Sequence, residues 1–431
     1  MAEGWRVVKV SDLIEAGALV INDGYRVTNK ELGLTGIPFV RGGDIGDGWI
    51  DTNVSDHILP EFQDRVTAKL SRPEDVAFIT KGTVGRVGYL RPETPTVVFA
   101  PQVCYWRVLD KKVLNPRFIY YLLKGREFQS NLDAVKTHGS MVADYVSVSD
   151  ERQFRLTIPP IKDQEAISRL LGLLDDKIEL NRRMNETLDA TARAFFKSWF
   201  VDFDPVRAKA ENRQPAGVDA EIAALFPSSF EESPLGMIPK GWRATKLKDV
   251  IEIYDYKRVP LSGRQRAEKK GVYPYYGAAS VMDYVNDYLF DGVFVLMGED
   301  GSVVNDDGTP VVQYVWGKFW VNNHAHVLSG KNSICTEHLM LFLVQANVQP
   351  YVTGAVQPKL NQENLRKIPF ILPVVNVCRA FEASVAPLYA QFRANAEESH
   401  TLASLRDALL PKLLSGEIRV REAVREVEQV A

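Results

Sequence analysis

Gly4-Trp5-Arg6-Val7-Val8-Lys9-Val10-Ser11-Asp12-Leu13 returns as Gly241-Trp242-Arg243-Ala244-Thr245-Lys246-Leu247-Lys248-Asp249-Val250 in this chain of 431 residues. Other correspondences follow in the same order. Ile37–Val40 resembles Tyr273–Tyr276, and Val76–Ile79 resembles Val293–Leu296. Self-similarity over such a long period indicates that one structural unit has been repeated. The sequence therefore predicts two copies of a single domain.

Within each copy, short β-like runs are bounded by Gly, Pro, Asn or Asp, which is typical of strands joined by turns. These runs are Val7–Val10, Val76–Thr80, Val97–Ala100 and Val103–Leu109, then Val293–Met297, Val311–Val315 and His324–Leu328. Helical patterns occur near Arg117–Lys124 and Glu337–Gln345. Each copy then passes a glycine-bearing turn and ends in an apolar run that closes on Pro159 or Pro373. We expect a compact α+β domain with a twisted sheet, present twice. The aromatics Tyr105, Trp106, Tyr120 and Tyr121 are expected in its core.

A long heptad pattern follows each copy. The apolar seam falls at alternating steps of four and three residues, which is typical of a helix that pairs with another. Its first-half positions are Ile167, Leu171, Leu174, Ile178, Asn181, Asn185, Leu188, Ala192, Phe195 and Trp199. Its second-half positions are Phe381, Val385, Leu388, Phe392, Asn395, Ser399 and Leu402. The second seam slips at Arg406 and resumes near Leu405, Leu409 and Leu413.

Asn181 and Asn395 occupy the same slot of the two seams. A polar residue in such a slot costs stability but can determine the register and the partner. A head-to-tail duplication allows the two helices to pair about a pseudo-twofold axis. We therefore expect them to form an antiparallel coiled coil that acts as a rigid spacer.

The remaining segments complete the predicted organisation. It runs as a first domain (1–160), a first helix (161–203), a linker (204–240), a second domain (241–373), a second helix (374–418) and a tail (419–431). The linker is rich in Pro and Gly, with one short helical pattern at Ala220–Phe226. Ile418–Ala431 alternates charge and valine, compatible with an extension of the last helix.

Composition narrows the class of protein. The net charge is −3, yet residues 240–272 hold 10 Lys and Arg against 4 Asp and Glu, and such a local basic patch can bind phosphate. No stretch approaches the ~20 apolar residues that span a bilayer, and the N-terminus lacks a signal-peptide core, so we expect a cytoplasmic protein. Cys104, Cys335 and Cys378 form no CxxC pair and are expected to be reduced, buried thiols.

Motifs for chemistry are missing from the sequence. There is no glycine-rich cofactor loop with an Asn/Asp-Pro-Pro-aromatic motif, as a DNA methyltransferase would need, and no G-x-x-x-x-G-K-[ST] pattern for ATP. His324 and His326 share a strand-like spacing but lack further ligands, which favours a structural role over a zinc site. We predict no catalytic residue and no metal site.

In this arrangement the chain resembles the specificity subunits of type I restriction–modification enzymes, from Gly4 to about Ile418. Four segments carry the resemblance: Leu170–Asn181, Ser198–Val206, Pro234–Trp242 and Leu409–Ile418. The resemblance implies two target recognition domains that each read half of a split, asymmetric site in double-stranded DNA. It also implies helices that dock two methyltransferase subunits, with motor–nuclease restriction subunits outside them. The chain itself would bind no cofactor, since S-adenosylmethionine, ATP and Mg would be held by the partner subunits.

Candidate DNA-contacting residues lie in glycine-bearing loops and in basic, aromatic stretches. A loop with glycines lets backbone N–H groups approach phosphates, and Lys or Arg adds charge. In the first copy they are Arg41, Thr80, Lys81, Gly82, Thr83, Arg86, Lys136, His138 and Ser140. In the second they are Tyr254, Tyr256, Lys257, Arg258, Arg264, Arg266, Ser302, Gln357 and Lys359. Arg41 matches a loop position that Ala278 occupies in the second copy, if Gly42 and Gly277 are paired closely.

Two other interpretations stay open. A duplicated coiled-coil scaffold or adaptor that binds only protein would explain the helices, but not why the β-rich domains diverge while the helices keep one register. An enzyme of an unrecognised type would turn over S-adenosylmethionine or ATP on its own, and no cofactor motif supports it.

Overall fold

The computed structural model describes residues 4–136, 145–354 and 357–428. The chain divides into two compact units. Unit 1 comprises residues 1–180 and 398–431, and unit 2 comprises residues 181–397. Each unit therefore contains one predicted domain together with a part of each long helix.

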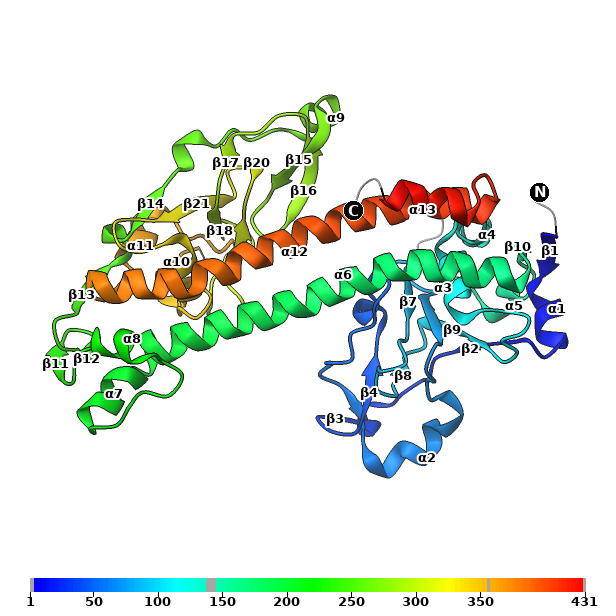
Figure 1. The fold of residues 1–431 in the computed structure, drawn as a ribbon, viewed down its shortest axis with the longest axis horizontal. Helices are drawn as coiled ribbons and strands as arrows, with labels where there is room; N and C mark the ends of the chain where they lie inside the picture. Colours follow the sequence, from blue (N-terminus) through cyan, green and yellow to red (C-terminus); the bar gives the residue numbers. More distant parts are fainter. Residues whose placement is uncertain (1–3, 137–144, 355–356, 429–431) are drawn as a thin grey trace. The chain divides into compact units, whose positions relative to one another are not determined.

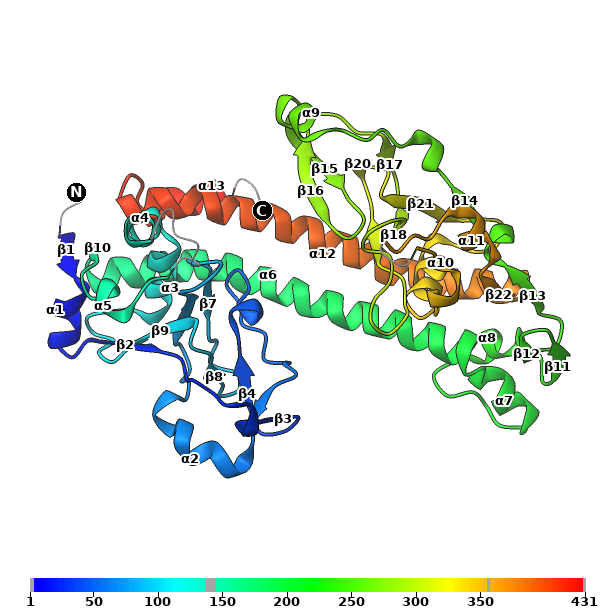
Figure 2. The ribbon, with the colours of Figure 1, turned by 180° about the vertical axis from the view of Figure 1, so that it is seen from behind.

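Two sheets form the domain of unit 1 (Figure 1). The main sheet has the order β2 (Leu19–Asp23), β9 (Val103–Val108), β6 (Val76–Ile79) and β7 (Val87–Tyr89). The second has the order β3 (Leu32–Gly33), β5 (His57–Ile58), β4 (Ile37–Val40) and β8 (Val98–Phe99). The main sheet lies nearer to the long helix α6, and β3 and β4 lie on its far side (Figures 1 and 2).

Short elements complete unit 1. Strand β1 (Arg6–Lys9) pairs antiparallel with β10 (Arg155–Ile158), which brings the start of the domain to its end. The helices are α1 (Val10–Glu15), α2 (Gln63–Val66), α3 (Pro116–Lys124), α4 (Arg126–Val135) and α5 (Val148–Glu151). Helix α3 begins with Asn115, whose side chain accepts a hydrogen bond from Phe118 N, and Pro116 follows where a missing N–H costs nothing.

Unit 2 repeats this plan. Its main sheet has the order β14 (Ile251–Ile253), β21 (Ala325–Gly330), β18 (Phe294–Gly298) and β19 (Val312–Val315). Its second sheet has the order β16 (Val281–Val285), β15 (Lys270–Tyr276), β20 (Lys318–Val321) and β17 (Phe290–Asp291). Strand β13 (Arg243–Lys246) pairs with β22 (Pro369–Leu372), as β1 does with β10. The helices of the domain are α9 (Gly263–Glu268), α10 (Thr336–Leu343) and α11 (Gln362–Lys367). The predicted α+β duplication is confirmed by this common topology.

Strand register aligns the two main sheets residue by residue. Ile79 and Gly298 end their strands in the same way, so Tyr89, which pairs with Val76, corresponds to Tyr314, which pairs with Val295. The strand Val76–Ile79 therefore matches residues 295–298, two residues later than the sequence comparison placed it. The sequence comparison was misled because both stretches are continuously apolar.

The second sheets align in the same manner. Val40 and Tyr276 correspond, since each accepts a hydrogen bond from the residue after its parallel partner strand. Arg41 therefore aligns with Gly277 and not with Ala278, which corrects the sequence-based pairing by one position.

The long helices are α6 (Ile161–Phe196), continued by a π-helical turn at Lys197–Val201, and α12 (Val375–Ser415). Two details differ from the sequence-based expectation. Gly416, at φ +71°, ends α12, and a separate helix α13 (Val420–Glu428) follows instead of an extension. The linker contains α7 (Asp204–Ala210), α8 (Ala220–Ala224) and the hairpin β11 (Phe230–Ser233) and β12 (Gly236–Pro239). Phe203, at φ +56°, makes the turn between α6 and α7, a conformation that the sequence pattern does not reveal.

Contacts between α6 and α12 occur within each unit. In unit 2, Asn181 Nδ2 donates to Asn395 O at 3.3 Å, Asn185 Nδ2 donates to Phe392 O at 3.1 Å, and Asn395 Nδ2 donates to Asn185 Oδ1 at 2.9 Å. In unit 1, Lys177 pairs with Glu398 at 3.1 Å. Asn181 and Asn395 are both buried.

The predicted seam positions differ in burial. Those that are buried are Ile167, Leu171, Leu174, Asn181, Ala192, Trp199, Phe381, Val385, Asn395, Leu409 and Leu413; those that are half-buried are Ile178, Asn185, Leu188, Phe195, Leu388, Phe392, Ser399, Leu402 and Leu405. Leu174 joins the core of unit 1, and Phe381 joins the core of unit 2. The helices thus form part of the core of each domain.

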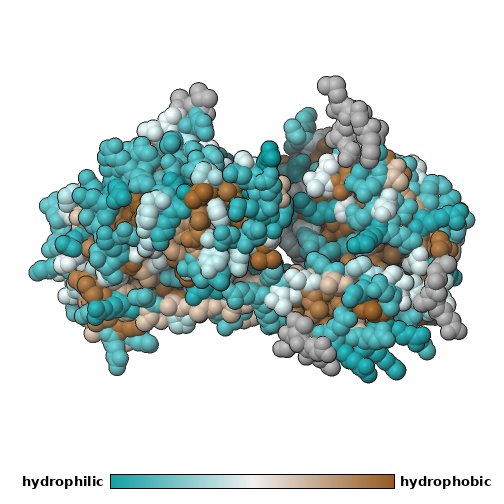
Figure 3. All heavy atoms as spheres, turned by 90° about the horizontal axis from the view of Figure 1, so that it is seen from above, coloured by the Kyte–Doolittle hydropathy of each residue, from teal (hydrophilic) through white to brown (hydrophobic). Residues whose placement is uncertain are grey.

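The four predicted core aromatics, Tyr105, Trp106, Tyr120 and Tyr121, are confirmed as buried. Hydrophilic residues predominate on the face shown in Figure 3, and apolar residues appear there in smaller patches. No helix among the described residues combines the length and apolar character that a membrane crossing needs.

Candidate nucleic-acid interface

In unit 1 a glycine-bearing loop joins β6 to β7. Gly82 and Gly85 have φ of +89° and +98°, values that side chains rarely adopt, and they turn the chain back into β7. Lys81 bridges to Tyr145 through backbone pairing, and both side chains are exposed. Arg86 is exposed and donates from Nη1 to Ile45 O at 3.2 Å. The loop thus presents two cations and exposed backbone beside an aromatic ring.

The other residues predicted in this unit are placed differently from one another. Arg41 follows β4, is exposed, and pairs with Asp56 at 2.6 Å. Thr83 is exposed in the loop, whereas Thr80 is buried and donates to Gln102 O at 3.1 Å, so its hydroxyl serves the fold. Lys136 pairs with Asp133 at 2.7 Å, one turn after Leu132, which packs against Gly85 of the loop. His138 and Ser140 lie outside the described residues.

The equivalent loop of unit 2 carries the opposite charge. Glu299 follows β18 as Thr80 follows β6, so Asp300 corresponds to Lys81 and Gly301 to Gly82. Asp300 bridges to Lys359 in the way that Lys81 bridges to Tyr145. Both glycines have positive φ. One loop geometry is therefore kept while its charge is inverted.

A buried network supports the unit 2 loop. His326 contacts Asp255 Oδ2 through Nδ1 at 2.6 Å and Leu360 O through Nε2 at 2.7 Å. Both nitrogens of the buried imidazole therefore have hydrogen-bond partners. Burial opposes the ionisation of Asp255, but its hydrogen bond with His326 and the nearby Arg258 outweigh it and lower its pKa. Arg258 also pairs with Glu299 at 2.8 Å.

Asp255, Glu299 and His326 are the only group of three possible metal ligands in the described part of the chain. Their ligand atoms lie within 4.8 Å of one another. The Arg258 guanidinium already contacts both carboxylates, and both nitrogens of His326 have partners. The arrangement is that of an internally neutralised ion cluster. Arg258, which the sequence predicts as a DNA contact, is thus held inside the fold with 12% of its side chain exposed.

Other predicted residues of unit 2 fall into two groups. Tyr256 is 76% exposed, and Lys257 lies over its ring and over that of the half-buried Tyr254 at 5.8 and 5.3 Å. Arg264 and Arg266 belong to α9, which leads into β15 at the open end of the β15–β16 hairpin (Figure 1). Arg264 is exposed beside Glu268, and Arg266 is held by Asp283 at 3.3 Å. The basic stretch of the sequence thus forms two separate groups, one at Tyr254–Lys257 and one on α9.

Residues of two turns meet beside the acidic loop. Gly301 N donates to Pro358 O at 3.2 Å, which places the exposed Ser302 near the turn that carries Gln357 and Lys359. Both of these side chains are exposed, and Lys359 lies 3.7 Å from Glu299. The predicted turn and loop are brought together in this unit.

Sequence reasoning missed two features of these edges. The first is Tyr145, which is half exposed beside Lys81 and belongs to no recognisable sequence motif. The second is the buried network that contains Glu299 and Asp255. These two residues are separated by more than forty positions in the sequence, and the strand register places Glu299 directly after β18. Sequence comparison alone could not have found the second, because it matches Thr80 to Met297, and only the strand register matches Thr80 to Glu299.

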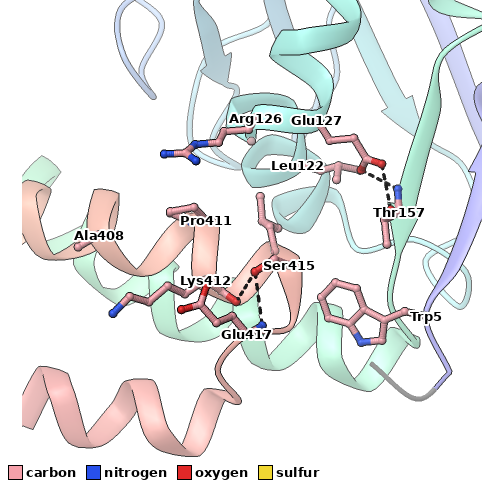
Figure 4. Close-up of a pocket in the computed structure, with 12 residues that line it drawn as sticks. Trp5, Leu122, Arg126, Glu127, Thr157, Ala408, Pro411, Lys412, Ser415 and Glu417 are labelled. Atoms are coloured by element: carbon pink, nitrogen blue, oxygen red, sulfur yellow. Dashed lines mark hydrogen bonds between the residues drawn. The ribbon is translucent and has the colours of Figure 1, made fainter. Parts of the chain in front are cut away.

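A separate cavity of about 600 Å³ in unit 1 is lined by Trp5, Arg126, Glu127 and Lys412, among others (Figure 4). Glu127 is engaged by Thr157, whose N and Oγ1 donate to it at 2.8 and 2.9 Å. Ser415 Oγ donates to Lys412 O. Glu127 and Ser415 thus form hydrogen bonds with neighbouring residues of the wall.

Residues 2–190 and 239–377, well over half of the chain, match the family described as the type I restriction modification DNA specificity domain. The chain belongs to this family. A specificity subunit of a type I restriction enzyme, HindI of Haemophilus influenzae, is 26% identical over 371 residues, 72% of this chain and 79% of that protein. The MjaIX specificity subunit of Methanocaldococcus jannaschii is 24% identical over 456 residues, 97% of this chain and 94% of that protein.

A solved structure shares the fold of this specificity-family chain. The type I restriction–modification S subunit of M. genitalium aligns with a TM-score of 0.55 and 15% identity, over 95% of this chain and 96% of that one. The two matched segments of the family coincide with the two copies of the domain, and each extends into or up to a long helix. The resemblance identified from sequence is therefore confirmed.

Proposed function

We propose that this specificity-family chain is the DNA-reading subunit of a multisubunit restriction–modification enzyme and performs no chemistry itself. Each domain would recognise one half of a split site in double-stranded DNA. The proposal is supported by family membership and by two domains with one topology and different loop chemistry. Contacts to phosphates would position each domain, and contacts to base edges would select the sequence.

The observation that carries the proposal is the pair Lys81 and Asp300, which occupy one position of the repeated loop. A lysine is attracted to phosphates and to guanine acceptors, whereas a carboxylate is repelled by phosphate and accepts from cytosine N4. With Lys81 on a phosphate and Asp300 on a base edge, the two domains would contact DNA differently at the same position and would read different bases. The target would therefore be asymmetric and not palindromic.

The long helices provide the spacing in this proposal. We infer that α6 and α12 pair along their length as an antiparallel coiled coil, which the asparagine contacts of unit 2 and the Lys177–Glu398 pair of unit 1 support. A rigid spacer sets the number of unread base pairs between the half-sites. The same helices would dock two methyltransferase subunits, with motor–nuclease subunits outside them. S-adenosylmethionine, ATP and Mg would then belong to those partners, and the free cysteines fit a reducing cytoplasm.

The alternative is a scaffold that binds only protein. The divergent loops disfavour it, because a scaffold has no need for exposed Lys81, Arg86 and Tyr256 at the strand ends. An adaptor would also give no sequence-dependent shift on duplex DNA, which a competition assay with unrelated duplexes measures directly.

The deciding experiment is methylation mapping of host DNA. The chain is expressed with the methyltransferase subunit of its own system, and single-molecule sequencing compares this strain with one that lacks the chain. A new split, asymmetric methylated motif is expected only when the chain is present. Replacing residues 1–160 by the matching domain of a relative should change one half of the motif and leave the other half intact. If the methyltransferase binds the chain and still no new methylated motif appears, the result favours the scaffold interpretation.

A second assay addresses catalysis. Purified chain incubated with duplex DNA and radiolabelled S-adenosylmethionine is expected to transfer no methyl group, and ATP should not be hydrolysed. Turnover by the isolated chain at a rate above that of the buffer would overturn the non-catalytic assignment.

A further inference from the structure

In each unit an ion pair joins the domain to the long helix that follows it in the sequence. The two ion pairs have opposite polarity. In unit 1 the cation belongs to the domain: Arg117 on α3 donates two hydrogen bonds to Asp176 on α6, at 2.7 and 2.8 Å. In unit 2 the anion belongs to the domain: Glu337 on α10 lies 3.4 Å from Arg393 on α12. All four side chains are at least half-buried or shielded by neighbours.

Arg117 and Glu337 occupy the same position of the repeat. Each is the second residue of its helix, after a cap at Asn115 or Cys335 whose side chain accepts from the N–H three residues later. Asp176 and Arg393 lie about one helical turn apart in the register that equates Ile158 with Leu372. The same docking point has therefore been built twice, with the charges exchanged between domain and helix.

The tyrosine beside each ion pair makes a different contact in the two units. Tyr89 and Tyr314 are equivalent by strand register, and they contact the two ion pairs differently. Arg117 lies over the ring of Tyr89, at 5.9 Å. The hydroxyl of Tyr314 donates to Glu337 at 2.8 Å and accepts from Arg393.

Gly172 is a second adaptation, in α6. A Cβ atom at this position would come within 2.7 Å of Arg117 Cζ, and Gly172 O accepts from Arg117 Nη2 at 2.9 Å. A glycine inside a helix destabilises that helix relative to alanine, so its presence here indicates a packing requirement. Arg117 also stands in the first turn of α3, where a cation is disfavoured by the helix dipole. Both costs are explained if the contact with Asp176 is required.

We propose that these two contacts form a docking code that restricts each domain to its own docking point, Asp176 for the first domain and Arg393 for the second. A first domain seated at the second docking point would bring Arg117 towards Arg393, and a second domain seated at the first would bring Glu337 towards Asp176. Like charges that are partly withdrawn from water repel, so either exchange is disfavoured, both within one chain and between two chains. The code keeps two domains of one fold from trading places, which a split asymmetric reader needs. The two ion pairs would restrict docking in this way whether or not the chain binds DNA.

The test is a charge-reversal cycle in the full-length protein. Glu337→Arg and Arg393→Glu are made singly and together, and hydrogen exchange of the α10 amides is followed with the oligomeric state. Each single variant is expected to exchange about tenfold faster in α10, the size expected for coupled contacting residues, or to form swapped dimers. The double variant is expected to return to the wild-type rate and to the monomer.

Three further variants distinguish docking from a general effect of charge. Glu363→Arg on α11, where Glu363 pairs with Lys367 at an exposed site, changes the charge equally and should leave α10 unchanged. Glu337→Gln removes attraction without repulsion and should exchange at an intermediate rate. In unit 1, Arg117→Glu with Asp176→Arg should recover only in part, because Arg91 also contacts Asp176.

A double variant no better than the worse single variant would overturn the code, whether or not the chain reads DNA. A charge-reversed chain that docks normally but still directs no methylation would instead count against the proposed function. Gly172→Ala offers one more check: it should accelerate exchange in α3 by displacing Arg117, and an unchanged rate would contradict the role given to Asp176.

Discussion

Asp175 on α6 and Arg406 on α12 form an ion pair inside unit 1, where Asp175 Oδ1 accepts from Arg406 Nη1 at 2.7 Å. Tyr121 of the domain donates its hydroxyl to the other oxygen of Asp175 at 2.6 Å. A buried carboxylate thus joins both helices and the domain. Arg406 is the residue at which the heptad pattern of the second helix slips, and this pairing explains the slip: the seam accommodates a charge at that point because its partner is present.

Replacing Arg406 is expected to destabilise the protein. In Arg406→Met the carboxylate of Asp175 stays buried with only Tyr121 as a strong donor, and breaking such a pair costs about 3–5 kcal/mol. Urea denaturation followed by circular dichroism measures the loss. Arg264→Met, at an exposed ion pair on α9, is the matched control and should change the free energy of unfolding by less than about 0.5 kcal/mol. Equal effects of the two variants would contradict the structural role of Arg406.

Lys81 is expected to contribute to DNA affinity without selecting bases. In the assembled methyltransferase complex, Lys81→Ala should weaken binding to every duplex and reduce the slope of log affinity against log salt concentration by about one. Lys162→Ala, an exposed lysine on α6, is the control and should keep the wild-type slope. Loss of affinity for the cognate sequence alone would instead make Lys81 a reader of a base.

The architecture is accessible from sequence because repetition exposes it. The loop that carries Gly82 can be matched to the loop that carries Gly301 from the repeat alone, and the strand register keeps that match. The surroundings of single charges are not accessible in this way. Arg258 carries the same signal as Lys257, a cation in a basic, aromatic stretch, yet one is neutralised inside and the other is exposed. The difference depends on Glu299, which only the folded sheet brings near Arg258.

Local patterns failed where a backbone changes direction. The π-helical turn and the left-handed Phe203 convert the end of α6 into α7, although the linker contains the prolines and glycines of a loop. Phe203 packs against Trp242 with ring centroids 5.7 Å apart, so tertiary burial stabilises a conformation that propensity disfavours.

Asn395 is expected to determine the register of α6 against α12 at a cost in the free energy of unfolding. Its amide donates to Asn185 Oδ1, and Asn181 donates to its backbone carbonyl. Asn395→Leu should cost about 1–3 kcal/mol, because Asn185 loses its buried donor. The double variant Asn185→Leu, Asn395→Leu should recover most of that loss while weakening the preference for one register, as apolar seams do. A double-mutant cycle in urea checks the first claim, and cysteine cross-linking between the helices checks the second.

Additive losses in that cycle would mean that the two asparagines do not interact across the helices. Cross-links confined to one register in the double variant would show that apolar packing alone sets the alignment. Either result would remove the reason for a repeated slot of polar residues in the two seams.

His338 is expected to make unit 2 sensitive to acid. Burial alone lowers its pKa to about 3, and its ring lies among Phe200, Phe381 and Phe370 with centroids 4.5 to 5.9 Å away. Because the folded-state pKa is below the unfolded value near 6.5, the unfolded chain binds the proton more readily. Stability is therefore full above pH 6.5 and falls as the pH drops towards 3, by about 2 kcal/mol at pH 5.

The first copy of the domain suggests the variant that tests this, since Phe118 occupies the position of His338. His338→Phe should leave stability at pH 8 within about 1 kcal/mol of wild type, because the new ring has a similar volume and apolar neighbours. At pH 5 it should be more stable than wild type by about 2 kcal/mol, as the proton-binding penalty is gone. Urea unfolding at the two pH values measures both differences, with the exposed His400→Gln as the control. A constant difference between His338→Phe and wild type across pH would mean that the folded and unfolded states bind the proton equally, so that burial does not lower the pKa of His338.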